Sequence, residues 1–461
     1  MTDTAADGLV PAPVEAVARR RSWTGVAFGR RFFLLMGVGL GWAVPAFADV
    51  RLGYAMLAWD TLLLVAWAID LARVFRAAPL TVRRAFQGPA ALSVDTPVAL
   101  TLVNGSSSVV HALVVDAVPR TLRTSPPSIS LDVAAGSEAT GTYDVRPVER
   151  GESHLGDTYL RCQGPWRIAE RWMRAETGRA IRVYPNLEEA KRDSIFLVRS
   201  RQIAIEKRHT RLRGAGREFE SLREYRTGDE FRDICWTASA RRGKLVTRTY
   251  QVERSQTIWL VVDVGRLMRA RIGGLTKLDY AVNASLSLAQ VALYSGDRVG
   301  FLSYGRGVRQ RVPASRGRAH LRTLMEQLAD VREEGAEADH LQAAGRLLSD
   351  QKRRSLVVWF TDLAETAMTP EVIDAASQMT PRHLVLFVVI GQPDLAAVAE
   401  QEPQDEEQMY RTAAAQEVLH RRELLLARLR ERGVLALGAD SATLSPTVVN
   451  AYLEIKERNQ L

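Results

Sequence analysis

The sequence predicts a multidomain protein that combines a two-helix transmembrane hairpin, a β-sandwich and a doubly wound α/β domain. Three observations predict this architecture: two long apolar stretches near the start, short strand-like runs after them, and apolar runs that alternate with helical segments from residue 257 onward. The length of 461 residues agrees with it, because one hydrophobic core rarely organises so long a chain.

The composition excludes several classes of protein. Apolar residues make up 46% and charged residues 25% of the chain, which is ordinary for a globular protein and argues against global disorder. Cys162 and Cys235 are far apart, so we expect neither a disulfide framework nor a cysteine zinc site, and a reducing compartment fits. The formal net charge of +9 favours an anionic partner, either a membrane surface or a nucleic acid.

Two apolar stretches predict a transmembrane hairpin over residues 30–75. Residues 32–48 carry no charge and residues 52–69 carry one, so each stretch is just long enough to cross a bilayer as a helix. Arginines flank both stretches, which predicts a multi-pass protein of the inner (cytoplasmic) membrane with both termini in the cytoplasm. We expect residues 1–29 to be a disordered cytoplasmic N-terminus. The flanking arginines are residues 19–21, 30, 31, 73, 76, 83 and 84.

Asp60 lies near the middle of the second stretch, where an aspartate costs roughly 2.5–3.5 kcal/mol. A relay role would need a chain of ionisable groups, and this stretch has only one. We therefore expect Asp60 to face the first helix or another copy of the chain, protonated or hydrogen-bonded to Trp42. In that position it would help to hold a helix bundle or a homo-oligomer.

Alternating apolar and polar residues predict a small β-sandwich over residues 88–186. The run "PVALTLVNGSSSVVHALVVDAVP" has Asn104-Gly105 near its centre, which is a strong signal for a β-hairpin. No titratable cluster in this region has a catalytic spacing. Further strand-like runs are "SISLDV", "ATGTYDVRPV", "DTYLRC" and "AIRVYPN".

Residues 187–256 predict a linker helix followed by a charged meander. The basic run "EKRHTRLRGAGRE" could bind phosphates, although such runs are more often solvated loops. No aromatic residues that could stack on bases are interleaved with these charges, so we expect no nucleic-acid partner.

Nearly continuous apolar runs predict buried strands in an α/β domain over residues 257–461. Helical segments lie between and after these runs, and a ligand of such a domain is expected at the carboxyl ends of the strands. The apolar runs cover 257–263, 297–304, 355–362 and 383–390. The helical segments cover 277–294, 318–329, 339–349, 370–379, 412–432 and 446–458.

Two of the predicted strands end in aspartate, Asp263 and Asp362, so both carboxylates could project into one crevice. This pattern resembles the von Willebrand factor type A fold, whose metal-ion-dependent adhesion site combines Asp-x-Ser-x-Ser, a threonine and a second aspartate. Within residues 223–252, "REYRTGD", "RDICWTASAR" and "KLVTRTYQVE" resemble the signature of the membrane-anchored family called domain of unknown function 58. The resemblance extends over nearly the whole chain after residue 30.

The adhesion-site pattern is incomplete in this chain. Gly265 and Leu267 stand where the resemblance implies two serines, and Ala338 stands where it implies the threonine. Two carboxylates and water are a poor substitute for the six oxygen ligands that Mg²⁺ prefers, so we expect no cofactor and no tightly bound metal, a loosely held Mg²⁺ being the alternative. Asp263 and Asp362 then act either as caps at the strand ends or as part of a partner-binding site.

The charged meander has two interpretations. Ion-paired hydrogen bonds could hold it against the α/β sheet, with Tyr225, Ile234 and Trp236 on its buried side. Alternatively it is a docking surface for another protein, because arginine and aromatic side chains often anchor interfaces. The partner-binding candidates are Arg223, Tyr225, Asp229, Arg232, Trp236, Arg241, Arg248, Asp263 and Asp362.

The sequence carries neither a GxxxxGK[ST] loop nor an HExxH motif, so we expect a membrane-anchored interaction module and not an enzyme. The resemblance implies a MoxR-type AAA+ ATPase as partner, which would supply nucleotide hydrolysis for the assembly or maturation of other proteins. Two alternatives stay open. The basic linker could bind anionic lipid or nucleic acid, or Asp263 and Asp362 could serve an unrecognised metal-assisted hydrolase.

Overall fold

The computed structural model divides the chain into two compact units, Met1–Asn186 and Leu187–Leu461. The boundary coincides with the predicted end of the β-sandwich. The predicted linker helix after residue 186 lies outside the described residues. The structure describes residues 9–20, 25–47, 49–75, 80–186, 218–226, 231–251, 256–362, 370–458 and 460.

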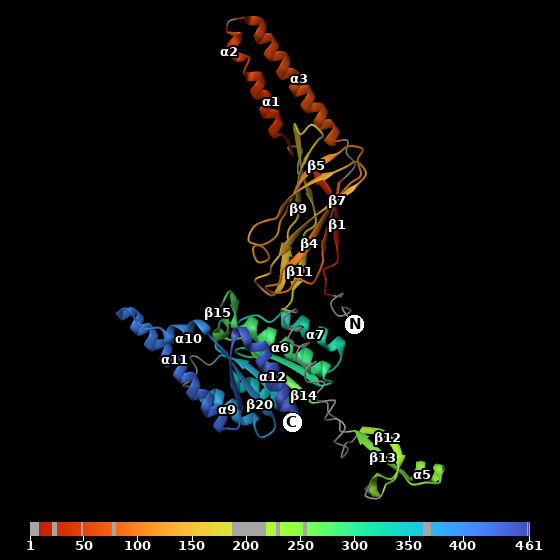
Figure 1. Cartoon of the computed structure of the whole chain (residues 1–461), viewed down its shortest axis with the longest axis vertical. Helices are drawn as coiled ribbons and strands as arrows, with labels where there is room; N and C mark the ends of the chain where they lie inside the picture. The colour runs from red at the N-terminus through yellow and green to blue at the C-terminus, as the bar shows by residue number, and fades with distance from the viewer. Residues whose placement is uncertain are drawn as a thin grey trace. The chain divides into compact units, whose positions relative to one another are not determined.

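The apolar region near the start forms three helices, α1 (Arg30–Leu40), α2 (Ala43–Ala46) and α3 (Val50–Phe75), drawn in red and orange in Figure 1. Within the described part of the chain, only Val50–Arg73 in α3 is long and apolar enough to cross a membrane. The expectation that residues 32–48 form one spanning helix is wrong. Three glycines and Pro45 weaken helix formation there, and α1 ends at Leu40.

α1 packs on α3 through a glycine. A Cβ at Gly39 would lie 2.6 Å from Trp59 Cδ1 and 2.9 Å from Asp60 Oδ1, so the two helices approach closely only because this side chain is absent. Trp59 Nε1 also donates a hydrogen bond of 3.0 Å to the carbonyl oxygen of Leu35. Asp60 thus faces α1, in agreement with the expectation, although no hydrogen bond joins it to Trp42 among the described residues.

Strands make up the rest of the first unit. One sheet has the order β6-β5-β9-β10-β1-β3-β4-β7, with β2 beside β10, and β8 pairs with β11. Buried residues from both halves of this sheet, and from β8 and β11, join one hydrophobic core, so the strands form two layers. The strands are β1 (Val14–Arg20), β2 (Val26–Phe28), β3 (Leu80–Phe86), β4 (Thr96–Asn104), β5 (Val110–Asp116), β6 (Ser128–Val133), β7 (Glu138–Val145), β8 (Gly151–Leu155), β9 (Thr158–Gln163), β10 (Ala169–Ala175) and β11 (Arg179–Val183).

β1 connects the two layers. Its first residues, from Val14 to Val17, pair with β3, and its last residues, from Ala18 to Arg20, pair with β10. The expected disorder of residues 1–29 is therefore wrong for β1 and β2, and the β domain begins before residue 88. The sequence pattern failed here because β1 finds its partners far along the chain, beyond the helices.

The Asn104-Gly105 turn does not make the expected hairpin. β4 pairs with β3 and β7, while β5 pairs with β6 and β9, so the turn carries the chain from one layer to the other. The buried Asn104 side chain holds this crossing: its Nδ2 donates to the carbonyl oxygens of Ser108 and Val133, and its Oδ1 accepts from the backbone of Ser106. Side-chain bonds thus replace the hairpin ladder.

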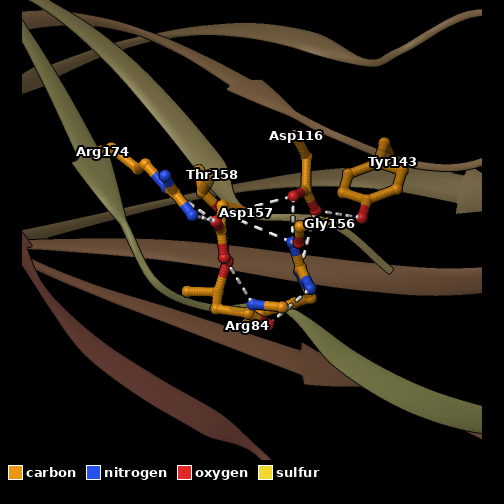
Figure 2. Close-up of polar contacts among 9 residues, drawn as sticks. Arg84, Asp116, Tyr143, Gly156, Asp157, Thr158 and Arg174 are labelled. Atoms are coloured by element: carbon orange, nitrogen blue, oxygen red, sulfur yellow. Dashed lines mark hydrogen bonds and ion pairs between the residues drawn. The ribbon is translucent and has the colours of Figure 1, made fainter. Parts of the chain in front are cut away.

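A buried ion pair lies in the β domain (Figure 2). The Arg84 guanidinium, from β3, makes two hydrogen bonds to the Asp116 carboxylate of β5 and donates to the carbonyl oxygens of Gly156 and Thr177 at 2.9 Å each. Tyr143 Oη donates to Asp116 Oδ2 at 2.5 Å, and burial raises the pKa of Tyr143, so this hydroxyl stays a donor. Arg83 and Arg84, which we expected to be membrane-flanking charges, both lie within β3.

Six strands form the sheet of the second unit in the order β18-β17-β14-β19-β20-β21, and only β18 runs antiparallel to its neighbour. The chain steps from β14 to one side and then, from β19 onward, to the other, as in doubly wound folds. The strands are β14 (Thr257–Asp263), β17 (Arg298–Tyr304), β18 (Val308–Ser315), β19 (Leu356–Thr361), β20 (Leu384–Gly391) and β21 (Leu435–Asp440).

Helices cover both faces of this sheet (Figure 1). α8, α9 and α11 bury apolar residues against one face, together with Trp259 and Val261 of β14. Side chains alternate along a strand, so the intervening buried residues of β14 face α6, which contacts β14 and β17 and has α7 and α12 beside it. The helices are α6 (Lys277–Tyr294), α7 (Arg318–Ala329), α8 (His340–Asp350), α9 (Pro370–Met379), α10 (Pro393–Glu400), α11 (Glu406–Glu431) and α12 (Leu444–Glu457).

Shorter elements complete the second unit. β12 and β13 form an antiparallel pair with α5 between them in the sequence, and a two-stranded turn precedes α6. They are β12 (Glu218–Glu224), η1 (Phe231–Asp233), α5 (Trp236–Arg242), β13 (Val246–Gln251), η2 (Arg266–Arg269), β15 (Arg271–Ile272), β16 (Leu275–Thr276) and η4 (Ser441–Thr443).

Replacing Arg84 tests the buried network. We expect Arg84→Met to destabilise the β domain by about 3–5 kcal/mol, because the Asp116 carboxylate would stay buried without its cation. Arg83→Met is the matched control: the Arg83 side chain is exposed and paired with exposed Glu15, so its loss should have little effect on stability. Hydrogen-exchange mass spectrometry of peptides from β3 and β9 measures both effects, and equal protection in the two variants would contradict the prediction.

Candidate functional site

The candidate site lies where β14 and β19 end. These neighbouring parallel strands flank the point at which the strand order reverses, which is where doubly wound domains bind ligands. Asp263 is the last residue of β14, and Asp362 directly follows β19. The structure thus brings both predicted aspartates to one edge of the sheet, and both side chains are buried.

Asp263 is held by two hydrogen bonds. Its Oδ1 accepts from the Gly265 backbone N–H at 2.7 Å, and its Oδ2 accepts from Thr361 Oγ1 at 2.7 Å. Burial, with a smaller contribution from nearby Asp362, raises the pKa of Asp263 to about 6, although the two hydrogen bonds oppose the shift. This carboxyl group therefore titrates close to physiological pH.

Asp362 is paired with a lysine, Lys277, that the sequence pattern does not single out. Lys277 Nζ donates to Asp362 Oδ2, and the two side chains are only 2% and 4% exposed. The position of Lys277 is fixed by a capping box at the start of α6, in which Thr276 Oγ1 accepts from Asp279 N and Asp279 Oδ2 accepts from Thr276 N at 2.9 Å. An ammonium group of the chain itself therefore neutralises the second aspartate.

The position of Gly265 offers little room for a side chain that would carry the missing hydroxyl. A Cβ at Gly265 would lie 3.0 Å from Ala338 Cβ and 3.0 Å from Asp263 Oδ1. Gly265 and Ala338 therefore face each other beside Asp263, as the resemblance implies for the serine and threonine positions. Leu267 lies in η2, half-buried.

The donor set does not fit a divalent cation. A hard ion such as Mg²⁺ takes six oxygen ligands, but Gly265, Leu267 and Ala338 offer no side-chain oxygen, and Asp362 is already bound to an ammonium group. Within the described residues, no group of three or more His, Cys, Asp or Glu side chains is arranged to hold a metal. The site is therefore better suited to a metal-free role.

Uncharged polar groups lie behind the aspartates. Tyr304 Oη accepts from Trp359 Nε1 at 2.5 Å and lies 2.8 Å from His340 Nδ1. Burial lowers the pKa of His340 to about 4 and raises the pKa of Tyr304, so both are neutral at physiological pH. They pack and orient the strand ends, and neither is exposed to a substrate.

The remaining predicted site residues belong to β12, α5, β13 and the residues between them. Ile234 is buried, as expected, and Tyr225 is half-buried with its ring centroid 6.2 Å from that of Phe231. Trp236 is 65% exposed, so its predicted place on the buried side is wrong. As the first residue of α5 it points outward, while Ser239 on the inner side binds the backbone of Cys235 and Val246.

The structure describes the side chains of some predicted site residues in this segment, and for others only the element in which they lie. Arg223 Nη1 donates to the carbonyl oxygen of Glu224 at 3.2 Å, and Arg241 is exposed in the last turn of α5. Arg232 lies in η1 and Arg248 in β13, and Asp229 falls outside the described residues. The packing of this segment against the α/β sheet stays a prediction.

A comparison with known protein families finds a match in the central part of the chain. Residues 221–417 match the sequence profile described as "Protein of unknown function DUF58". The match covers less than half of the chain. The DUF58 region contains Asp263, Lys277 and Asp362, and it contains the α5 segment that carried the resemblance. It is shorter than the resemblance suggested, because the β domain and the apolar helices lie outside it.

Two relatives that match this chain are named as uncharacterized proteins. The chain is 28% identical over 182 residues to the uncharacterized protein Rv1480 of Mycobacterium tuberculosis, which covers 39% of this chain and 56% of that protein. It is 24% identical over 198 residues to the uncharacterized protein YeaD of Bacillus subtilis, covering 41% and 45%. The chain thus spans little more than half the length of the Mycobacterium relatives it matches.

Solved structures show only distant likeness. Conserved hypothetical protein BatB of Bacteroides thetaiotaomicron is 12% identical with a TM-score of 0.30, over 44% of this chain and 99% of that one. A von Willebrand factor type A protein of Catenulispora acidiphila is 15% identical with a TM-score of 0.27, over 45% and 43%. At these TM-scores the likenesses support no further argument.

Titration with metal tests the conclusion drawn from the donor set. We expect calorimetric titration of the full-length protein with Mg²⁺ or Mn²⁺ to show no micromolar binding, because the Lys277 ammonium already neutralises Asp362. Micromolar binding that disappears in Asp263→Ala would contradict this.

The two aspartates should respond to neutralisation in opposite ways. The raised pKa of Asp263 means that its ionised form opposes folding: stability is full at low pH and is lost as pH rises from about 4 through about 6. Asp263→Asn should therefore stabilise the α/β domain at pH 7, by up to about 3 kcal/mol, and have little effect near pH 4. Asp362→Asn should destabilise it by about 3–5 kcal/mol, because buried Lys277 would lose its partner.

Pulse proteolysis in urea, scored on the band of the α/β domain, measures both variants. The two substitutions remove the same charge from adjacent strand ends and so serve as controls for each other. Destabilisation of similar size in both would contradict the assignment of Lys277 to Asp362.

Proposed function

We propose that this chain is a membrane-anchored protein-binding module that recruits another protein to the membrane. The observation that carries the proposal is the surface around α5 in the DUF58 region. There Trp236 is 65% exposed, although the two residues before it, Ile234 and Cys235, are buried. A large aromatic side chain held outward on a helix is a common anchor of protein interfaces.

The topology of the β domain supports a pair of membrane crossings. β1 precedes α1 and β3 follows α3, and the two strands pair with each other in one sheet. Both ends of the helical region are thus on the same side of any membrane, so the chain between them crosses an even number of times. If α3 crosses, α1 and α2 must carry the chain back across, and they pack along α3.

The exposure of the helices supports the same proposal. Many apolar side chains of α1 and α3 are exposed, which water disfavours and lipid accommodates. With both flanks in the cytoplasm, the protein would be a multi-pass protein of the inner membrane whose soluble units are cytoplasmic.

The proposed docking surface consists of Phe231, Trp236, Arg241 and Arg242. The two aromatic side chains and the two arginines are exposed. Tryptophan and arginine are the residue types that most often dominate binding energy, and aromatic groups with flanking cations favour a partner with an acidic, partly apolar face.

We propose a MoxR-type AAA+ ATPase as the partner, as the resemblance to the DUF58 family implies. The chain would then act as an adaptor that connects the ATPase to proteins being assembled or matured at the membrane. In the described residues, the charged side chains at the strand ends are bonded to the chain itself, which favours recognition over chemistry.

The hydrolase alternative receives less support. A metal-assisted hydrolase needs an open cation site, whereas Lys277 binds Asp362 and the other side-chain ligands are missing. The basic linker that could bind lipid or nucleic acid lies outside the described residues.

Substitution at the docking surface tests the proposal. We expect Trp236→Ala or Arg241→Glu to weaken binding of the source organism's MoxR-type ATPase about thirtyfold, the effect of losing an anchor worth about 2 kcal/mol. Matched controls are Trp172→Ala, which truncates another exposed tryptophan, and Arg428→Glu, which reverses an exposed charge on α11. Binding is measured by interferometry on full-length protein in nanodiscs, and equal affinity for all four variants would refute the surface.

A further inference from the structure

The junction between the helices and the β domain is held by a buried carboxylate. Asp70, near the end of α3, accepts two backbone hydrogen bonds from the connection between β9 and β10, from Trp166 N at 3.2 Å and Ile168 N at 3.1 Å, and a third from Ala169 N, the first residue of β10, at 3.1 Å. A Cβ at Gly164 would lie 2.4 Å from Asp70 Oδ1, so only glycine allows this approach. The β9–β10 connection is therefore held next to Asp70, near the C-terminal end of α3.

Further contacts make this junction rigid. The Gly29 N–H donates to the carbonyl oxygen of Ile168 at 2.7 Å, which ties the start of α1 to the same connection. Phe32, Leu63 and Ile168 form a small buried cluster across the two helices and the β domain. Both helices and the β9–β10 connection therefore occupy one fixed arrangement.

The level of Asp70 coincides with the end of the apolar span. The run from Leu52 to Ile69 covers about 27 Å at 1.5 Å per residue, close to the thickness of a bilayer's hydrocarbon core. Asp70 follows that run directly, and Arg73 ends the candidate span. If α3 crosses the membrane, the β9–β10 connection lies where the hydrocarbon gives way to headgroups.

The side chains at this level are those that favour a lipid headgroup region. Trp166 is 41% exposed, and the Arg73 guanidinium lies over its ring at 4.4 Å. Arg31 Nη1 lies 3.5 Å from the carbonyl oxygen of Trp166, and the Arg31 side chain is exposed. Tryptophan and arginine are enriched at membrane interfaces, where the ring contacts acyl chains and the guanidinium binds phosphate.

The charge at this position is positive. The nearby carboxylate of Asp70 is buried and bonded to backbone N–H groups, whereas Arg31 and Arg73 are exposed. We infer that the β9–β10 connection, with Trp166, Arg31 and Arg73, is a headgroup-binding surface for anionic phospholipid that fixes the β domain against the membrane. This inference rests on the proposed membrane crossing of α3.

Site-directed spin labelling of the full-length protein in nanodiscs tests the depth of this surface. Labels are placed in turn at residues 64, 166 and 172, with both native cysteines replaced by serine. Trp172 is the matched control for Trp166, since it is also exposed, at 44%, and lies on β10 of the same hairpin. We expect depth measurements to place the labels at 64, 166 and 172 in hydrocarbon, headgroups and water, respectively.

The measured depths distinguish failure of the headgroup contact from failure of the proposed membrane crossing. A label at 64 in hydrocarbon with a label at 166 in water would overturn the headgroup contact and leave the anchor intact. A label at 64 in water would overturn the membrane crossing and the inference with it.

The preference for anionic lipid is tested by charge. We expect the wild type, in nanodiscs of mixed phosphatidylcholine and phosphatidylglycerol, to retain phosphatidylglycerol when analysed by native mass spectrometry. Removing Arg31 and Arg73 together, as Arg31→Gln and Arg73→Gln, should weaken this retention roughly fivefold for each arginine. The control pair Arg83→Gln and Arg174→Gln removes the same charge from exposed positions on β3 and β10. Equal retention in both double variants would overturn the inference.

Discussion

The buried contact between Lys277 and Asp362 determines what the α/β domain can do. An aspartate at the end of β19 would need a cation, and the first residue of α6 supplies one from within the chain. With this charge neutralised and Asp263 bonded to Gly265 and Thr361, the edge of the sheet is satisfied without a metal ion. This arrangement agrees with the proposed role of the α/β domain as a binding platform, in which recognition would depend on its surface.

Buried charges in the first unit are likewise neutralised or hydrogen-bonded by other groups of the chain. Arg84 and Asp116 are enclosed by carbonyl, hydroxyl and phenol partners, as Figure 2 shows, and Asp70 is enclosed by backbone N–H groups. In each case the buried charged group is stable because its donors and acceptors are hydrogen-bonded. A buried charge with missing partners lowers the stability of the fold by several kcal/mol. These buried charged residues therefore hold elements of the first unit together. Arg84 and Asp116 join β3 to β5, and Asp70 joins α3 to the β9–β10 connection.

Local pattern predicts much of the α/β domain. Continuous apolar runs identified β14, β17, β19 and β20, and the predicted bounds of α6, α7 and α9 agree with the structure. The edge strand β21 was missed, because edge strands are only partly buried and lack such runs, and the short helix α10 was missed as well. β1 was missed because its pairing depends on strands beyond the helices, which no local window includes.

The candidate site was predicted in part. The two aspartates follow from strand ends, but their cation lies 85 residues before Asp362 and is brought there only by the fold. One feature of the sequence could have indicated Lys277. A lysine at the first position of a helix interacts unfavourably with the positive end of the helix dipole, which suggests that a nearby anion stabilises its charge. The orientation of Trp236 could not be read from sequence, since a tryptophan beside buried residues suits either side of a short helix.

The position of β1 has a practical consequence for work with this protein. A soluble fragment that begins after α3 would lack the strand between β3 and β10, and it would expose two unpaired strand edges that invite aggregation. A fragment that keeps residues from Val14 onward and replaces the helices with a short loop would retain that strand, because Val17 and Thr81 are already paired neighbours.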